Sequence, residues 1–180
     1  MPKSLFIAAI CVFSFFLSPG AFCKDWEQVL EERLPEYGHR NWIIIADAAY
    51  PKQSAPGIET IYTGAGQVEV LEKVLKAVDT AKHVRPMVML DAELDSVSEK
   101  NAGGVDAYRN ELRRIFGERA PKVMAHDDII RKLDDGAKMF SILLLKTDMT
   151  IPYTSVFIEL DCGYWSAAKE QELRKNFPTP

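Results

Sequence analysis

The chain has 180 residues, with 22 Lys and Arg against 26 Asp and Glu and a net charge of −4. Because the charge is negative and no basic stripe interrupts the interspersed charges, the composition argues against nucleic acid as a partner. The length fits a single domain with a sizeable core, and no internal repeat, low-complexity tract or long linker divides it.

The first 23 residues have the three parts of a secretory signal peptide. Lys3 precedes an apolar run over 5–17, and a Ser-Pro-Gly break with small residues follows it. The apolar run is shorter than the roughly 20 residues that cross a bilayer. We therefore expect residues 1–23 to be cleaved on export to the periplasm or the extracellular space, leaving no stable membrane span. An uncut membrane anchor is the alternative.

Cleavage also decides the cysteine content of the mature chain. Cleavage after Cys23, or alternatively after Ala21, removes Cys11 and one lysine but no acidic residue. With Cys23 removed as well, the net charge is −5 and Cys162 is the one cysteine left, so no internal disulfide is expected. We expect Cys162 to be a buried residue at a strand end, with a reactive or intersubunit thiol as the alternative. Lipid modification of Cys23 is a further alternative.

Predicted helices and strands alternate along the rest of the chain. Helices are predicted where apolar residues recur at helical spacing, over 25–36, 67–81, 105–116, 127–137 and 166–176. Strands are predicted where short apolar runs are bounded by turn residues, over 42–46, 58–62, 86–91, 122–125, 140–145 and 154–160. Asp127 or Asp128 is expected to cap the fourth helix.

This alternation, with central strands that are apolar throughout, requires a sheet covered by helices on both faces. The predicted fold class is α/β, a three-layer α/β/α sandwich with a mostly parallel, mixed central sheet. The last two strands are close in sequence, and we expect them to form an antiparallel pair. The predicted organisation is a signal peptide over 1–23, an α/β domain over 24–165 and a charged helical tail over 166–180.

Two of the three histidines lie where a site would be expected. His39 and His126 are at element boundaries next to predicted strands, where functional side chains gather on a rigid scaffold. His83 lies at the end of the long helix predicted over 67–81, where an interaction with the helix dipole is expected.

Acidic and hydroxyl side chains mark the ends of several strands. Asp47 follows the strand over 42–46, and the carboxyl ends of parallel strands are where open α/β sheets bind ligands. A loop cap that accepts backbone N–H bonds is the alternative for Asp47. Asp91 has the same kind of position on another strand, and Tyr153 precedes the last strand with a phenol that can donate a hydrogen bond. The sequence shows no metal-ligand spacing, phosphate loop or nucleophile elbow, so neither a metal nor an organic cofactor is expected.

The segment from Gly38 to Pro51, GHRNWIIIADAAYP, resembles the signature of the D-ribose pyranase and L-fucose mutarotase family. The signature begins with Gly-His, runs through an apolar strand to Asp-Ala and reaches a proline, with eight residues from the histidine to the aspartate. The later segments that resemble the family's second buried strand and closing hairpin are 86–90, 140–145 and 152–158. The resemblance extends over about residues 28–160.

The resemblance implies a divergent sugar mutarotase-like isomerase that interconverts anomers or ring forms of a free monosaccharide without a cofactor. The family's enzymes are cytoplasmic, whereas the predicted signal peptide makes this chain an exported one. It implies that His39 is the acid/base and that Asp47, His126 and Tyr153 bind the sugar. Ser155 is a further implied sugar contact, at a position where the family usually has Asn. It also implies a homo-oligomer, commonly a ring-like decamer, with the site between subunits.

Two other functions remain open on the sequence alone. One is a sugar-binding protein on the same scaffold that does not turn its ligand over, and the other is a structural oligomer whose pocket is covered by Trp165 and the tail. Eight extended residues separate His39 from Asp47 by up to about 26 Å. Both can therefore serve one pocket only if the chain bends sharply or a neighbouring subunit supplies one of them.

Overall fold

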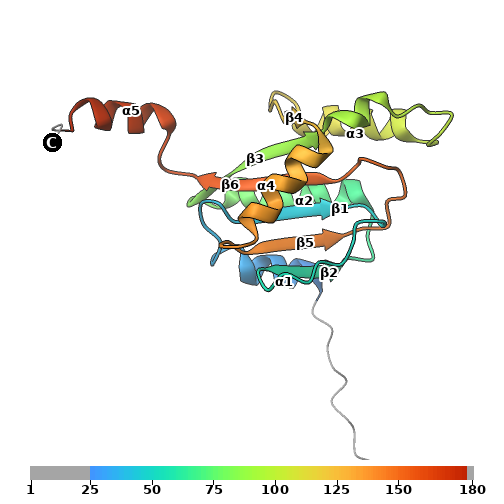
Figure 1. Cartoon of the computed structure of the whole chain (residues 1–180), viewed down its shortest axis with the longest axis horizontal. Helices are drawn as coiled ribbons and strands as arrows, with labels where there is room; N and C mark the ends of the chain where they lie inside the picture. The colour runs from blue at the N-terminus through green and yellow to red at the C-terminus, as the bar shows by residue number, and fades with distance from the viewer. Residues whose placement is uncertain (1–24, 178–180) are drawn as a thin grey trace, which may run out of the picture.

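The computed structural model describes residues 25–177, and the signal peptide predicted over 1–23 lies outside the described residues (Figure 1). Within the described part, the strands are β1 (Trp42–Ala46), β2 (Ile58–Tyr62), β3 (Val84–Asp91), β4 (Lys122–Met124), β5 (Ile142–Lys146) and β6 (Val156–Cys162). The helices are α1 (Trp26–Arg33), α2 (Gln67–Thr80), α3 (Val105–Phe116), α4 (His126–Gly136) and α5 (Ala167–Lys175), with a 3₁₀ helix η1 (Ala92–Ser96) after β3.

These six strands form one sheet in the order β2-β5-β1-β6-β3-β4. The pairs β1–β5, β2–β5 and β3–β4 are parallel, whereas β6 runs antiparallel to both of its neighbours, β1 and β3. The arrows of β1 and β5 point one way in Figure 1 and that of β6 points the other way. The predicted mixed, mostly parallel sheet is therefore confirmed.

The expected pairing of the last two strands is wrong, because β1 lies between them. Ile44 of β1 is in register with Leu144 of β5 on one side and with Phe157 of β6 on the other. Every residue of β1 is buried, so this strand is suited to the middle of the sheet, where both edges are hydrogen-bonded. The connection over 147–155 is long enough for the chain to cross β1 between β5 and β6, whereas a tight hairpin turn would be too short.

Helices cover both faces of the sheet, as predicted. Side chains of α1, α2 and α3 pack against alternate strand residues such as Ile43 and Ile45 on one face. On the other face α4 packs Ile129 and Leu133 against Ile44 and the strand residues beside it. Figure 1 shows α4 crossing the front of the sheet while α1 and α2 lie behind it. The fold is a three-layer α/β/α sandwich.

The start of α4 differs from the prediction. The helix begins at His126 with Ala125 as its N-cap residue, and neither Asp127 nor Asp128 caps it. The carboxylate of Glu93, from η1, instead accepts hydrogen bonds from the backbone N–H of His126 at 3.0 and 3.1 Å. A side chain from another element thus satisfies the first helix amide, which is a contact that local sequence does not reveal.

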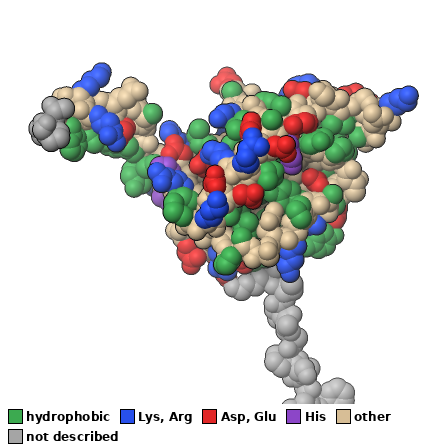
Figure 2. Space-filling model, viewed as in Figure 1, with side chains coloured by type: hydrophobic (Ala, Val, Ile, Leu, Met, Phe, Trp, Pro, Cys, Tyr) green, Lys and Arg blue, Asp and Glu red, His purple; other side chains and the backbone are tan. Residues whose placement is uncertain are grey.

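The C-terminal helix α5 stands apart from the sandwich. It follows the end of β6, and none of its residues is buried. Gly163, between β6 and α5, packs closely on neighbouring backbone, since a Cβ at this position would lie 2.7 Å from the carbonyl oxygen of Lys82. Figures 1 and 2 show α5 projecting away from the body, and in Figure 2 acidic and basic side chains are mixed over the visible face. In residues 25–177, no helix has the length and apolar character needed to span a membrane.

Candidate functional site

Polar side chains from four elements meet at one edge of the sheet. Asp47 follows β1, Asp91 ends β3 and His126 begins α4 directly after β4, so all three lie at the carboxyl ends of parallel strands. Tyr153 and Ser155 reach the same edge because β6 is antiparallel and starts there. This is the edge where open α/β sheets bind ligands.

A cavity of about 350 Å³ opens at this edge. Its walls come from the loop after β1, the first turns of α4 and the segment before β6, and the lining residues are Asp47, Ala49, Tyr50, Pro51, Gln53, His126, Ile130, Pro152 and Tyr153. The volume is within the range of about 300–1,000 Å³ that is usual for small-molecule sites. The structure thus brings three of the sequence-predicted residues, Asp47, His126 and Tyr153, to one cavity.

Asp47 is held by hydrogen bonds on both carboxylate oxygens. Its Oδ1 accepts from the backbone N–H of Ala49 at 2.9 Å, and its Oδ2 accepts from the hydroxyl of Ser155 at 2.9 Å. Ser155 is buried and also accepts from the backbone N–H of Asp47 at 3.2 Å. Ser155 therefore lies behind Asp47 and outside the cavity lining, and its direct contact with a sugar stays a prediction.

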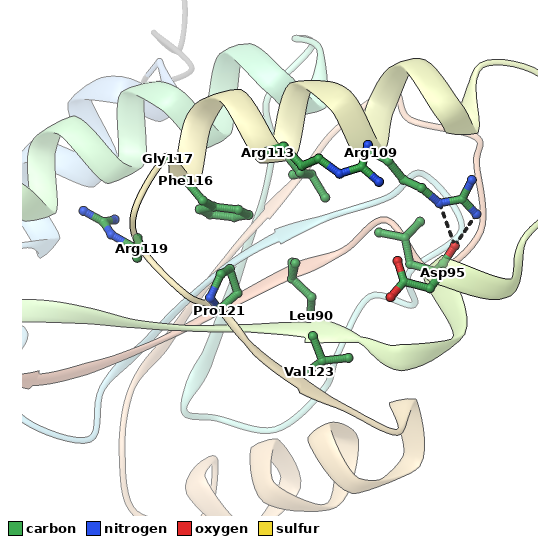
Figure 3. A pocket seen from close by; sticks show the side chains of 11 residues that line it. Leu90, Asp95, Arg109, Arg113, Phe116, Gly117, Arg119, Pro121 and Val123 are labelled. Carbon is green, nitrogen blue, oxygen red and sulfur yellow. Dashed lines mark hydrogen bonds between the residues drawn. The ribbon is translucent and has the colours of Figure 1, made fainter.

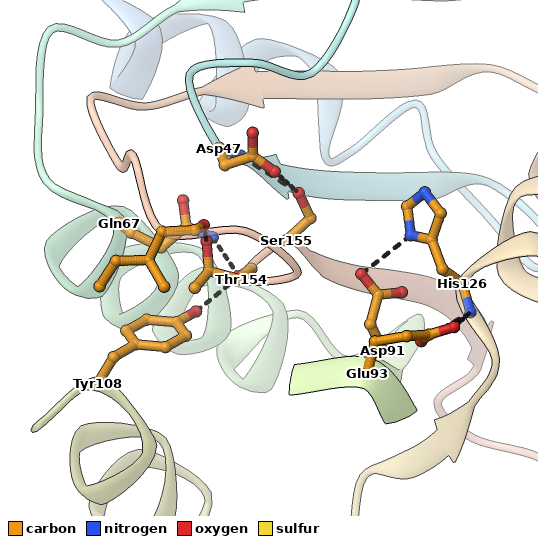
Figure 4. Close-up of polar contacts among 9 residues, drawn as sticks. Asp47, Gln67, Asp91, Glu93, Tyr108, His126, Thr154 and Ser155 are labelled. Atoms are coloured by element: carbon orange, nitrogen blue, oxygen red, sulfur yellow. Dashed lines mark hydrogen bonds and ion pairs between the residues drawn. The ribbon is translucent and has the colours of Figure 1, made fainter. Parts of the chain in front are cut away.

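The imidazole of His126 contacts a buried acid. Its Nδ1 lies 3.0 Å from Oδ2 of Asp91, whose side chain has no exposed surface, whereas the imidazole is about one third exposed. Figure 4 shows the imidazole with Nδ1 toward Asp91 and its other nitrogen pointing away from that acid. The strand-end position of Asp91 is visible in the sequence, but this pairing is not, because the two residues are 35 positions apart.

The surroundings of Asp91 disfavour its negative charge. Burial raises the pKa of Asp91 to about 6, the contact with His126 partly opposes that rise, and the nearby acids Glu93 and Asp47 add to it. Among the described residues, no donor reaches the other carboxylate oxygen, Oδ1. Asp91 is therefore protonated more easily than an ordinary aspartate, although its contact with His126 favours the charged form.

Tyr153 completes the polar wall of the cavity. Its ring meets that of His126 edge-on, with 5.6 Å between centroids and 78° between planes. Its backbone has a φ of 60°, in the left-handed region that residues other than glycine adopt at a cost of about 1–3 kcal/mol. The surrounding structure must therefore hold this backbone in place.

A buried network next to Tyr153 provides that support. The amide nitrogen of Gln67 donates to the carbonyl oxygens of Ile45 and Thr154 at 3.1 and 2.7 Å, and the hydroxyl of Tyr108 donates to the carbonyl of Thr154 at 2.7 Å. Thr147 donates to Oε1 of Gln67 at 2.6 Å (Figure 4 draws part of this network). These residues were not predicted from the sequence, although a fully apolar helix stripe with one glutamine at its start was a usable signal.

His39 lies at the opposite edge of the sheet. It precedes the amino end of β1, and the backbone N–H of the next residue, Arg40, donates to the carbonyl of Leu160 near the end of β6. The His39 imidazole is 58% exposed and lies 3.8 Å from Asp161. The length of β1, roughly 17 Å for five residues, separates His39 from Asp47. Within one subunit the structure does not bring His39 to the cavity.

The remaining histidine and the cysteine lie away from the cavity. His83 follows the end of α2, and its Nε2 is 3.1 and 3.0 Å from the carbonyl oxygens of Leu34 and Tyr37. It therefore contacts the carboxyl end of α1, and not of the long helix as expected. Cys162 is the last residue of β6 and is half-buried, so the expectation of a buried thiol is wrong.

A second hollow, of about 250 Å³, lies between α3 and the strands β3 and β4 (Figure 3). Its floor is apolar, with Leu90, Phe116 and Val123. Its arginines are engaged within the protein: Arg109 donates to the carbonyl oxygens of Leu94 and Val97, and Arg119 to Asp79. No histidine lines this hollow, so the first cavity is the better candidate for proton-transfer chemistry.

Fold and site together define a class of protein: an α/β sandwich with an acid, a histidine and a phenol around a cavity of small-molecule size. No family model and no curated protein matches the chain. In residues 25–177, no three histidine, cysteine or carboxylate side chains come together as a metal site would require.

Two solved structures have the same fold as this chain. The chain is similar to Bacillus subtilis RbsD complexed with D-ribose, with 18% identity, a TM-score of 0.53 and coverage of 74% of this chain and 91% of that one. It is also similar to FucU from Bifidobacterium longum, with 17% identity, a TM-score of 0.51 and coverage of 74% and 94%. The chain therefore has the fold that the sequence resemblance predicted.

Proposed function

We propose that this protein is a divergent member of the D-ribose pyranase and L-fucose mutarotase family that interconverts anomers or ring forms of a free monosaccharide. The observation that carries the proposal is the meeting of Asp47, His126 and Tyr153 at one cavity. A structure of the same fold, RbsD, is a complex with D-ribose.

The residue types suit this chemistry. Opening a sugar ring requires removal of a proton from the anomeric hydroxyl and delivery of a proton to the ring oxygen. Histidine can do either near neutral pH. The Asp47 carboxylate, held in a fixed orientation by Ala49 and Ser155, can accept hydrogen bonds from sugar hydroxyls. Tyr153 can donate from its phenol.

The position of His39 makes an oligomer part of the proposal. Because β1 separates His39 from the cavity, His39 acts as acid/base only if a second copy of the chain brings it there. We therefore propose a homo-oligomer in which the His39 edge of one copy faces the cavity of the next. Export of the chain, with cleavage near residue 23, is also proposed.

The test is saturation-transfer NMR on free hexoses, pentoses and deoxysugars, with and without the full mature chain. Faster exchange between the anomer signals of at least one sugar supports the enzyme, and unchanged exchange for every sugar contradicts it. Asp47→Asn is expected to weaken sugar binding, and the exposed Asp127→Asn is the matched control.

One observation favours a second candidate, a sugar-binding protein without turnover. The single hydroxyl proton of Ser155 is used for Asp47, so this position offers the sugar no donor of the kind that an Asn would. A thermal shift with a sugar, together with unchanged anomer exchange, would select this candidate. The structural-oligomer alternative requires a pocket covered by Trp165 and the tail. Within one subunit the cavity is open, and Trp165 is not among its lining residues.

A further inference from the structure

Two acids that have no role in the proposed function hold His126 in place. Asp91 contacts the ring at Nδ1 with a distance of 3.0 Å, and Glu93 accepts two hydrogen bonds from the backbone N–H of the same residue. Both contacts leave the other ring nitrogen, Nε2, pointing away from Asp91 (Figure 4). His126 is itself a lining residue of the cavity.

We propose that Asp91 is a positioning residue that fixes the tautomer of His126 and makes His126 the base that takes the proton from the anomeric hydroxyl. The inference rests on the proposed function and deepens it, since the family resemblance assigned His126 a binding contact alone. When neutral His126 donates its Nδ1–H to the Asp91 carboxylate, the lone pair is on Nε2, the nitrogen free to accept a proton.

Burial makes the effect of Asp91 strong. The Asp91 side chain has no exposed surface, so water reaches this contact only from the side of the imidazole, which is about one third exposed. A buried carboxylate in this place holds the ring in one orientation and stabilises the imidazolium that forms after proton transfer. The groups that surround the pair are Asp47, Glu93, Tyr50, Tyr108 and Tyr153.

In the proposed reaction one histidine accepts a proton and another donates one. Nε2 of His126 takes the proton from the anomeric hydroxyl, a carbonyl forms at the anomeric carbon, and the bond from that carbon to the ring oxygen breaks. The electron pair goes to the ring oxygen, which takes a proton from protonated His39 of the neighbouring copy. Closure on the other face of the carbonyl returns both protons to their starting groups, so neither anomer gains nor loses a proton.

The first test reads the tautomer of His126 by ¹⁵N NMR and needs no sugar. In the wild-type oligomer at pH 8, we expect a proton on Nδ1, with the signal assigned through His126→Gln. Asp91→Asn is expected to move the proton to Nε2, because the amide group can donate to Nδ1. Asp127→Asn removes an exposed acid one residue away and should leave the tautomer unchanged. A proton on Nε2 in the wild type overturns the proposal.

The second test measures anomer exchange across pH 4.5–8.5. Asp91→Asn is expected to slow exchange about 100-fold, at the low end of what a general base contributes. Protonation of Asp91, whose pKa burial raises to about 6, is expected to lower the wild-type rate at low pH, and this contribution should be absent from the variant. In a His126→Gln background, Asp91→Asn should cause no further loss, because Asp91 acts through His126. A full additional loss in that background overturns the proposal.

The two tests separate the inference from the function on which it rests. Exchange that is absent for every sugar in the wild type contradicts the proposed function, and the tautomer measurement then decides the role of Asp91 by itself. Exchange that is present and unaffected by Asp91→Asn leaves the function standing and overturns the inference.

Discussion

Ser155 and Asp47 hold each other through two hydrogen bonds. The serine hydroxyl donates to Oδ2 at 2.9 Å and accepts from the aspartate backbone N–H at 3.2 Å. The two residues are 108 positions apart, and their contact joins the end of β1 to the start of β6. The carboxylate that faces the cavity is thereby fixed by a side chain that does not line it.

Ser155→Ala should therefore affect both binding and stability. Loss of the hydroxyl frees one oxygen of Asp47 and leaves its backbone N–H without an acceptor, so we expect a loss of about 1–2 kcal/mol in the free energy of unfolding. The KM for a turned-over sugar should rise several-fold with a smaller change in kcat. Urea denaturation and NMR exchange measure the two effects. The exposed Ser98→Ala is the control, and equal effects of both variants would contradict the prediction.

Gln67→Ala should be more damaging than any surface substitution. The Gln67 side chain is buried and bonds to the carbonyls of Ile45 and Thr154 and to the hydroxyl of Thr147. Truncation removes three buried hydrogen bonds, although the Thr154 carbonyl keeps its bond from Tyr108 and the Thr147 hydroxyl its bond to Ala46. We expect a loss of about 2–4 kcal/mol in the free energy of unfolding.

Denaturant unfolding of Gln67→Ala measures this loss. The exposed Gln171→Ala in α5 is the matched control, with an expected change within about 0.5 kcal/mol. A Gln67→Ala variant as stable as this control would contradict the role of the network.

The raised pKa of Asp91 gives stability a pH dependence of known sign. The pKa is about 6 in the folded protein and near 3.8 in the unfolded chain, so the folded state binds more protons between these values. The contribution of Asp91 to stability is present below about pH 4 and is lost as pH rises through 6. The loss amounts to about 3 kcal/mol at most.

Asp91→Asn removes this pH dependence. Relative to the wild type, the variant should gain about 2–3 kcal/mol in unfolding free energy between pH 4 and pH 7.5. Thermal unfolding of both proteins at several pH values checks the difference, in which titration of the other carboxylates cancels. A constant difference across the range would show that burial does not raise the pKa of Asp91.

Mixed oligomers test whether one site uses two subunits. His39→Asn and His126→Gln should each slow exchange by about 100-fold or more in a pure oligomer. If each site takes His39 from one copy and His126 from the next, co-expression in equal amounts should restore activity at about a quarter of the sites. Activity that does not recover on mixing, with oligomers of normal size, would contradict a shared site.

Removal of residues 164–180 should leave the stability of the sandwich nearly unchanged. No residue of α5 is buried, and an isolated helix of nine residues is marginal in water. We expect the midpoint of thermal unfolding to change by about 2 °C or less. A larger fall that depends on protein concentration would indicate that α5 packs against another copy.

Much of the fold could be predicted from sequence because its elements are encoded locally. The buried runs at 42–46 and 142–146 and the stripe of α2 are apolar at the spacing that each element requires. Strand order could not be read in the same way. β1 lies between β5 and β6 because it hydrogen-bonds to strands about a hundred residues later in the sequence. The spacing of apolar residues does not indicate which strands pair.

The features of the site can also be separated into those encoded locally and those that depend on long-range contacts. Asp47, His126 and Tyr153 could be predicted because each stands at the end of a strand or helix. Three other features of the site could not be predicted, because they join residues that are far apart in the sequence. They are the contact of His126 with Asp91, the hydrogen bonds from the His126 backbone to Glu93, and the hydrogen bond of Ser155 to Asp47. His39 shows the limit of motif spacing: eight residues along an extended strand place two motif residues at opposite edges of the sheet.

The strand order also determines when the chain can fold. β1 is an early strand, yet both of its partners, β5 and β6, lie in the last quarter of the sequence, with Ile44 opposite Leu144 and Phe157. Contacts of such long sequence separation form late and slowly. A chain emerging from the ribosome therefore has no central sheet until nearly all of it has been made. For a protein that we propose to be exported, this delay keeps the polypeptide unfolded during the interval in which it could still be threaded across a membrane.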